Sequence, residues 1–398
     1  MVGISKRMEG LDESVTLAIT ARAKDLRARG YDIIGFGAGE PDFDTPANIK
    51  KAAVGAIEKG KTKYTPVGGI DELKDAVIGK FKKDNGIDYS RDEILVSCGG
   101  KHSIFNLFLA LLDPLDEVII PAPYWVSYPV MVKLAGGAAR IVETDETTGF
   151  KMTPEAFKKN ITKRTKAVVI NSPSNPTGCV YTPKELESIA DEALKKGVFI
   201  ISDEIYEKLY YGDAPIASIA SLSQEARKNS IVLNGVSKAY AMTGWRIGYA
   251  AGPRELIKAM TNIQSQSTSN PASISQWAAV EALNGTQETV AKMAAEFKKR
   301  RDVMVEGLNS IKGVSCVRPD GAFYAFANIS SFFGKRLKER AIAGSVAFTS
   351  FFLEEAEVAV VPGIAFGSDA HIRLSYACSE DDIRLGLKRM GEALGRLE

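Results

Sequence analysis

The sequence has very few histidines and cysteines for its length. It contains two histidines, His102 and His371, and four cysteines in 398 residues. The scarcity of histidine excludes His-rich metal sites, and no two cysteines have the CxxC spacing of a structural zinc site. Widely separated cysteines in a long chain are typical of reduced thiols, so we expect a cytoplasmic protein that holds no metal.

The chain also lacks a surplus of charge and any long apolar segment. Lys and Arg number 51 against 49 Asp and Glu, and the net charge of +2 provides no field for nucleic acid or a membrane surface. Apolar runs such as 105–112 are too short to cross a bilayer, and residues 1–14 show no secretory signal pattern. The composition, 45% hydrophobic and 25% charged, favours a globular enzyme.

Short apolar runs in the middle of the chain predict strands. They are 94–97, 117–121, 166–171, 198–203, 230–234 and 246–251. They are apolar throughout, as in strands covered on both faces, and helical patterns such as 103–112 and 183–196 separate most of them. This alternation predicts an α/β fold with a mostly parallel sheet sandwiched by helices. The last two runs are too close for a helical crossover, so one should be antiparallel.

The pattern changes after about residue 285. The segment 288–308 predicts a long amphipathic helix, and 314–318, 321–326 and 358–361 predict strands of a smaller α+β unit. We therefore divide the chain into an N-terminal arm and part of a small domain (1–45), a large domain (46–285) and the remaining small domain (286–398). Two helix-like segments before Gly35 should pack against the C-terminal unit.

Residues that could bind a ligand or take part in a reaction follow the predicted strands, at the edge where ligands bind in open α/β sheets. Gly99 and Gly100 open a helix, as a phosphate-binding turn does, although most such turns are only turns. Trp125 is either core or a stacking surface for a ring. Asn175 lies in a loop with two prolines, which either hold its amide at a ligand or simply stiffen the loop.

Three charged residues lie at or near the ends of further predicted strands. Asp203 either caps a helix or faces a cationic ring nitrogen. Lys238 stands among apolar neighbours, and desolvation makes such an amine nucleophilic, although most lysines are surface charges. Arg246 suits a structural ion pair or a phosphate. Taken together, these residues fit pyridoxal phosphate, with Lys238 as the Schiff-base lysine and Asp203 at the ring nitrogen.

Ten segments carry a resemblance to a known family. They are GAGEPDFDTP, KYTPVGGI, GGKHSIFNLF, PYWVSYP, NSPSNPTG, SDEIYE, SKAYAMTGWRIGYA, RPDGAFY, VVPGIAFG and HIRLSYA, between residues 37 and 377. The chain resembles the class I, fold-type I pyridoxal-phosphate-dependent aminotransferases, and among them the bacterial aspartate (aspartate/prephenate) branch. The resemblance implies a seven-stranded sheet in the large domain, pyridoxal 5'-phosphate as cofactor, and a homodimer with shared active sites.

The resemblance also implies the site residues. The catalytic residues would be Lys238, Asp203 and Tyr206. The cofactor would be bound by Tyr64 (from the neighbouring subunit), Gly99, Gly100, Lys101, Trp125, Asn175, Asp203, Tyr206, Ser237, Lys238 and Arg246. The substrate would be bound by Ser14, Thr16, Gly39, Lys101, Trp125, Asn175 and Arg373, of which Arg373 would grip the α-carboxylate.

The activity implied is ping-pong transfer of the amino group of L-aspartate, or a related dicarboxylic amino acid, to 2-oxoglutarate. Asp12 stands where prephenate-using relatives carry a basic residue, and Gly235 stands where many relatives carry a phosphate-binding serine. The alternatives are prephenate/arogenate or aromatic substrates, or a pyridoxal-phosphate carbon–sulfur lyase. A regulator that uses this fold as a sensor is a further alternative from another class, against which the lack of a basic patch argues.

Overall fold

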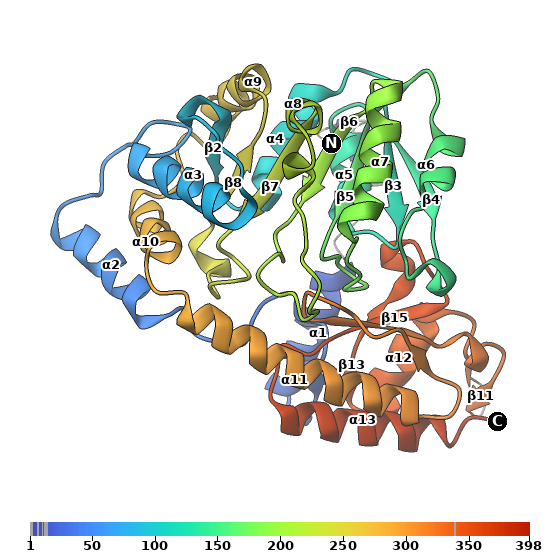
Figure 1. The fold of residues 1–398 in the computed structure, drawn as a ribbon. Helices are drawn as coiled ribbons and strands as arrows, with labels where there is room; N and C mark the ends of the chain where they lie inside the picture. The colour runs from blue at the N-terminus through green and yellow to red at the C-terminus, as the bar shows by residue number, and fades with distance from the viewer. Residues whose placement is uncertain (1–2, 6–7, 10, 12–14, 338–339) are drawn as a thin grey trace.

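A sheet of seven strands lies at the centre of the larger part of the molecule (Figure 1). The structure is a computed structural model that describes residues 3–5, 8–9, 11, 15–337 and 340–398. The strand order is β2 (Ile94–Ser97), β8 (Gly248–Ala251), β7 (Ser230–Gly235), β6 (Phe199–Asp203), β5 (Thr165–Asn171), β3 (Glu117–Ala122) and β4 (Ala138–Glu143). Strand β8 is antiparallel to β2 and β7, and the other neighbours are parallel. The predicted α/β fold is confirmed, including one antiparallel strand.

Two of these strands differ from the prediction. No apolar run marked β4, because it lies at the sheet edge and only Val142 among its residues is buried. The predicted run 246–251 forms a strand only from Gly248, since Arg246 has a left-handed backbone with φ of 55°. Edge position and a positive φ are both features that an apolar count cannot detect.

Helices cover both faces of the sheet, as Figure 1 shows. The helices of this part are α2 (Ala47–Glu58), α3 (Asp71–Asn85), α4 (Gly100–Leu111), α5 (Ser127–Leu134), α6 (Pro154–Asn160), α7 (Pro183–Lys196), α8 (Gln224–Lys228), α9 (Arg254–Ser265) and α10 (Ser273–Asn284), of which α2 packs on α10. Successive strand residues alternate between the faces. Leu95 and Leu233 pack in the layer that contains α4 and α9, whereas Val96 and Val232 pack in the layer that contains α3 and α10. Burial on both faces explains the uninterrupted apolar runs.

Helix α7 shows how local signals fix an element. The Thr182 hydroxyl accepts a hydrogen bond from the Glu185 amide, and the Glu185 carboxylate accepts one from the Thr182 amide at 2.7 Å. Gly197 ends the helix in a left-handed conformation with φ of 67°. Such reciprocal caps satisfy amides that have no partner within the helix, which is why this helix begins and ends as predicted.

The C-terminal part is built on an antiparallel sheet in the order β14 (Val361–Pro362), β15 (His371–Ser375), β10 (Tyr324–Asn328) and β9 (Ser315–Cys316). Helices α11 (Glu288–Ser310), α12 (Ser345–Glu355) and α13 (Glu380–Leu394) pack around it, and β11 (Arg336–Leu337) pairs with β12 (Arg340–Ala341). In Figure 1, α11 runs from beneath the large part to the small one. The predicted α+β unit is confirmed.

The N-terminal segment packs on this C-terminal part, as expected. Strand β1 (Ile34–Gly35) pairs in parallel with β13 (Val358–Ala359), and α1 (Val15–Ala28) lies beside β13 (Figure 1). The predicted run 358–361 is thus two strands in two different sheets. Within the described residues before Gly35, α1 is the one α-helix, where two helix-like segments were expected.

The division of the chain near residues 45 and 285 remains a proposal. Helix α10 packs on α2 and α3, whereas α11 packs on α13 and β10. This change of partners supports a boundary between α10 and α11. Across the described ranges, no helix has both the length and the apolar character that a membrane span requires.

Candidate active site

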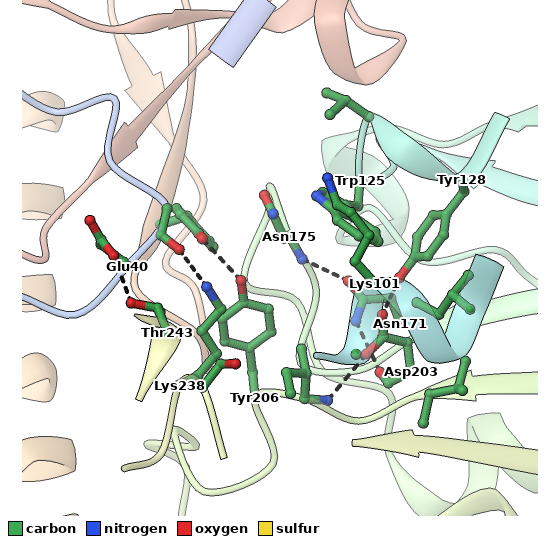
Figure 2. A pocket seen from close by; sticks show the side chains of 18 of the residues that line it. Glu40, Lys101, Trp125, Tyr128, Asn171, Asn175, Asp203, Tyr206, Lys238 and Thr243 are labelled. Atoms are coloured by element: carbon green, nitrogen blue, oxygen red, sulfur yellow. Dashed lines mark hydrogen bonds between the residues drawn. The ribbon is translucent and has the colours of Figure 1, made fainter. Parts of the chain in front are cut away.

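The carboxyl ends of the parallel strands open into a cavity of about 450 Å³. Figure 2 shows the side chains that line it. The predicted site residues among them are Gly39, Gly100, Lys101, Trp125, Asn175, Asp203, Tyr206, Ser237, Lys238, Arg246 and Arg373. Residues that are up to 334 positions apart in the chain therefore share one cavity. The strand-end rule placed Gly100, Trp125, Asn175, Asp203 and Lys238 at this edge of the sheet, whereas Gly39 and Arg373 came only from the family resemblance.

Among the described side chains and glycines, two predicted site residues, Gly99 and Tyr64, do not line this cavity. Gly99 immediately precedes Gly100 and caps α4. Tyr64 lies between α2 and α3 with 92% of its surface exposed. Ser14 and Asp12 lie outside the described residues. Thr16 belongs to α1, but its side chain is not among those that the structure describes.

One end of the cavity is suited to an anion. Helix α4 points its N-terminus there, with first-turn amides from Gly100 and Lys101. Gly99 has φ of 89°, and a Cβ at this position would lie 2.4 Å from Nη2 of Arg246. Burial, together with the charge of Arg246, lowers the pKa of Lys101. Two cations at a helix N-terminus form a phosphate-binding environment.

Gly235, at the end of β7, leaves little room for a side chain. A Cβ there would lie 3.0 Å from both the Cα of Gly248 and the carbonyl oxygen of Ile247. Strand β8 would have to shift to admit a side chain. The cavity-lining groups at the end suited to an anion are Ser237, Arg246 and the first residues of α4.

Asp203, at the end of β6, is a buried carboxylate that faces the cavity. Its Oδ2 accepts a hydrogen bond from the Tyr128 hydroxyl at 2.6 Å, and its Oδ1 accepts one from the Ile205 amide at 3.2 Å. Burial raises the pKa of Asp203 despite the hydrogen bond from Tyr128. A carboxylate in such a place is stabilised by a cationic partner, and no helix follows for it to cap.

Tyr128 and Asn171 were missed by the sequence analysis as site residues. The Tyr128 ring packs edge-on against Trp125, with the centroids 5.2 Å apart. The Asn171 amide donates to the backbone oxygen of Asp203 at 2.9 Å and accepts from the Asn175 amide at 2.9 Å. Both residues lie inside quoted motifs, but only the three-dimensional structure reveals that Tyr128 reaches Asp203.

Lys238 lies on the opposite side of the cavity from Tyr128 and Asp203 (Figure 2). Its ammonium donates to the backbone oxygen of Gly39. Burial lowers the pKa of Lys238 to about 8, although the carboxylate of Glu40 opposes this shift. Glu40 in turn accepts a hydrogen bond from Thr243 at 2.7 Å. An amine with this pKa is partly unprotonated near neutral pH and can act as a nucleophile or a base.

Arg373, in β15, brings a buried positive charge to the cavity. It is 3% exposed, donates to Asn175 Oδ1 and to the backbone oxygen of Gly37 at 3.0 Å each, and lies 4.5 Å from the centre of the Tyr324 ring. Its Nε has no hydrogen-bond partner among the described residues. Burial lowers the pKa of this guanidinium. A buried guanidinium held only by neutral groups is suited to a carboxylate ligand.

Tyr206 lies between Lys238 and Asp203 (Figure 2). Its hydroxyl is 2.9 Å from the hydroxyl of Tyr324, and its ring centre is 5.9 Å from the Lys238 ammonium. The cavity thus combines an anion end, a buried carboxylate, a stacking indole and a desolvated amine. This donor set fits pyridoxal phosphate. Within the described ranges, no cluster of His, Cys, Asp and Glu could hold a metal ion.

Comparison with known proteins agrees with this geometry. Residues 31–390 match the family model described as "Aminotransferase class I and II". The chain belongs to this family of aminotransferases. It is 52% identical over 390 residues, 97% of this chain and 98% of the relative, to the aspartate aminotransferase of Geobacillus stearothermophilus. It is 50% identical over 397 residues, 99% of each chain, to a probable aspartate/prephenate aminotransferase of Rickettsia typhi.

Solved structures of aminotransferases share the whole fold. The aspartate aminotransferase of Rhizobium meliloti superposes with a TM-score of 0.97 at 44% identity and covers 100% of both chains. The aspartate aminotransferase of Thermus thermophilus, solved with maleate, superposes with a TM-score of 0.93 at 45% identity. The match covers 99% of this chain and 100% of the Thermus chain. The predictions of family and fold are therefore confirmed.

Proposed function

We propose that this aminotransferase transfers the amino group of L-aspartate, or a related dicarboxylic amino acid, to 2-oxoglutarate with pyridoxal 5'-phosphate. One observation carries the proposal: a desolvated amine, Lys238, and an un-neutralised guanidinium, Arg373, face one cavity that also holds the buried carboxylate of Asp203. Aspartate aminotransferases of about 50% identity support the choice of substrate.

The residues would hold the cofactor as follows. Its phosphate would lie at the N-terminus of α4 with Ser237 and Arg246, and its ring would lie against Trp125. Asn175 and Tyr206 would contact the 3′-oxygen. When bound, the cofactor supplies an electron sink that stabilises a carbanion at the substrate Cα. Asp203 would hold a proton on the ring nitrogen, because a buried carboxylate stabilises a positive charge beside it.

Lys238 would hold the resting cofactor covalently and then act as a base. Its Nζ would take the proton from the substrate Cα, for which a pKa of about 8 is well suited. Arg373 would bind the α-carboxylate of the substrate in a bidentate pair. The Lys101 ammonium, 5.0 Å from the centre of the Trp125 ring, would attract the second carboxylate, with Ser14 and Thr16 as further contacts.

We propose a homodimer with shared sites. Tyr64 is too exposed for a role in its own cavity, and the neighbouring helix α2 exposes two apolar side chains, Val54 and Ile57, by 52% and 53%. A second copy would cover these residues and bring its own Tyr64 to the phosphate. The four cysteines are free thiols, which supports a cytoplasmic location.

Half-reactions test the proposed activity directly. The purified holoenzyme is mixed with each amino acid in turn, and the cofactor absorbance is followed. Aspartate and glutamate should convert the cofactor fastest, and prephenate should be a poor acceptor compared with 2-oxoglutarate. Borohydride followed by peptide mapping should place the cofactor mass on Lys238. Release of ammonia in place of an oxo acid, or no adduct on Lys238, would overturn the proposal.

A further inference from the structure

A cluster of polar side chains outside the cavity joins the large and small parts of the molecule. Glu146 lies in a short 3-10 helix (Glu146–Thr148) that follows β4. Its Oε1 accepts a hydrogen bond from the side-chain amide of Asn328 at 2.6 Å and lies 2.7 Å from His371 Nε2. Asn328 and His371 belong to β10 and β15 of the small sheet. One carboxylate oxygen therefore holds two adjacent strands of the other part.

The hydrogen-bond directions follow from the chemistry of the groups. A carboxylate only accepts, so Nε2 of His371 carries the proton in this contact. Burial lowers the pKa of His371, which favours the neutral ring, so Nδ1 accepts from the Ser368 hydroxyl at 2.8 Å. Burial acts against ionisation of Glu146, but the hydrogen bonds from Asn328 and His371 hold its pKa below the usual value. Both ring nitrogens of His371 and one carboxylate oxygen of Glu146 are thus paired.

The same strand carries the cluster and the substrate-binding arginine. His371 and Arg373 are two residues apart in β15 and therefore point to the same face of the sheet. Their partners across the strand pair, Asn328 and Phe326, share this face. The ring of Phe326 stacks on His371 with centroids 4.7 Å apart and an interplanar angle of 7°.

Aromatic packing fixes this face against the large part. Phe150, four residues after Glu146, packs edge-on against both His371 (5.4 Å) and Phe326 (5.7 Å). Phe326 also contacts Phe366 edge-on, and the Phe366 ring centre lies 4.9 Å from the Arg373 guanidinium. A displacement of His371 would therefore be passed to Arg373 both along the strand and through two rings.

We propose that Glu146 and His371 are positioning residues that set the place of Arg373 in the substrate site. The proposal rests on the proposed role of Arg373 as the carboxylate-binding residue. Neither residue lines the cavity, so neither touches the substrate. Without the Glu146 contact, the small sheet would keep its own hydrogen bonds but would lose the polar contact that ties Asn328 and His371 to the large part. Arg373 would then meet the substrate carboxylate in a less favourable position.

The test separates substrate binding from the chemical step. E146A and H371F are compared with the wild-type holoenzyme, because H371F keeps a ring on Phe326 but loses both hydrogen bonds. For each variant the KM for aspartate and 2-oxoglutarate, kcat, and the Kd of the unreactive dicarboxylate succinate by calorimetry are measured. We expect KM and Kd to rise about tenfold, as for one misplaced charged hydrogen bond, with kcat changed less than about twofold.

Two further variants control for a merely structural effect. E146Q keeps an acceptor for Asn328 and His371 and should restore most of the succinate affinity. K151Q removes the 2.6 Å ion pair between Lys151 and Glu185. Lys151 belongs to the same segment as Glu146, but its partner lies in α7 of the large part, so K151Q should leave KM unchanged. H371F keeps the test decisive if E146A does not fold.

The outcomes distinguish this proposal from the function on which it rests. If the wild-type enzyme transaminates and R373L loses substrate affinity, but E146A and H371F keep wild-type KM and Kd, the positioning role is wrong. An equal loss of kcat and cofactor affinity in these variants would also contradict it. If R373L itself keeps its affinity for succinate, the proposed role of Arg373 is at fault.

Discussion

The two ends of the active-site cavity are assembled in different ways. At one end, Asp203 lies in the central sheet, and its donors come from α5 and from the residues that directly follow β6. At the other end, Arg373 comes from the small sheet and is held by Asn175 and Gly37, which are 198 and 336 positions away in the chain. The carboxylate end belongs to one sheet, whereas the guanidinium end depends on contacts between distant parts.

This difference matches the two tasks that we propose for the site. Asp203 is held in place because β6 pairs with a strand on each side, β5 and β7. A fixed position suits a group that must keep one ring atom protonated. A charge held by several segments responds to their relative position, which suits a group that binds and releases substrates. We expect changes at the first end to lower kcat and changes at the second to raise KM.

The largest effect should come from Lys238, which lines the same cavity. K238A removes both the covalent attachment and the base, so transamination should fall by a factor of at least about 10⁵. Single-turnover absorbance and steady-state assays measure this loss. K238R, which keeps the charge without a nucleophile, should be equally inactive. Near-normal turnover in K238A would remove this lysine from the mechanism.

A substitution of Asp203, at the carboxylate end, should mainly lower kcat. D203N keeps the shape of the side chain but loses its charge, so the rate should fall by about 10³ while the cofactor stays bound. Glu204 provides a matched control, since it is the next residue, is equally buried, and accepts from Ser202 and Ser218 at 2.8 Å instead of facing the cavity. E204Q should keep its rate within a few-fold. Equal losses would mean that buried charge, rather than the ring nitrogen, decides the effect.

A substitution of Arg373, at the guanidinium end, should mainly raise KM. R373L should lower kcat/KM for aspartate by about 100-fold, because a buried bidentate pair is lost. Its affinity for the cofactor, measured by equilibrium dialysis, should stay within about threefold of the wild-type value. A variant that loses cofactor and substrate affinity together would erase the distinction between the two ends.

The carboxylate end could be predicted almost entirely from the sequence. Uninterrupted apolar runs gave β5, β6 and β7, and the strand-end rule then placed Asp203 and Lys238 at one edge. Tyr128 escaped this reasoning. No local pattern says that a helix residue 75 positions before Asp203 will point its hydroxyl at that carboxylate.

The guanidinium end could not be derived in this way. Arg373 was identified only through the family resemblance, because its place depends on how the small sheet docks on the large part. The run 358–361 illustrates the difficulty, since its two ends pair in different sheets. Local propensity describes strands, but it does not describe which partner a short strand meets when several are available.

The amine of Lys238 should also affect the stability of the fold. Burial lowers the pKa of Lys238 to about 8 from 10.5, so between these pH values the unfolded chain binds more protons than the folded one. The free energy of unfolding of the cofactor-free protein should therefore rise with pH across this window, by about 3 kcal/mol in total. K238M, which has no titrating amine, should lack this rise and be more stable than the wild type at pH 7. If urea unfolding gave the same pH dependence of the free energy of unfolding for the wild type and K238M, this prediction would be wrong.

The smallest effect should come from Tyr128, whose hydroxyl is one of two donors to Asp203. Y128F removes one hydrogen bond to a charged group, which is worth about 1.5 kcal/mol, so kcat should fall about tenfold with KM little changed. Y240F is the matched control, because the Tyr240 hydroxyl makes a 2.9 Å hydrogen bond to Gln287 away from the cavity. If Y128F instead raised KM and spared kcat, Asp203 would act on the substrate, and the division of labour between the two ends would not hold.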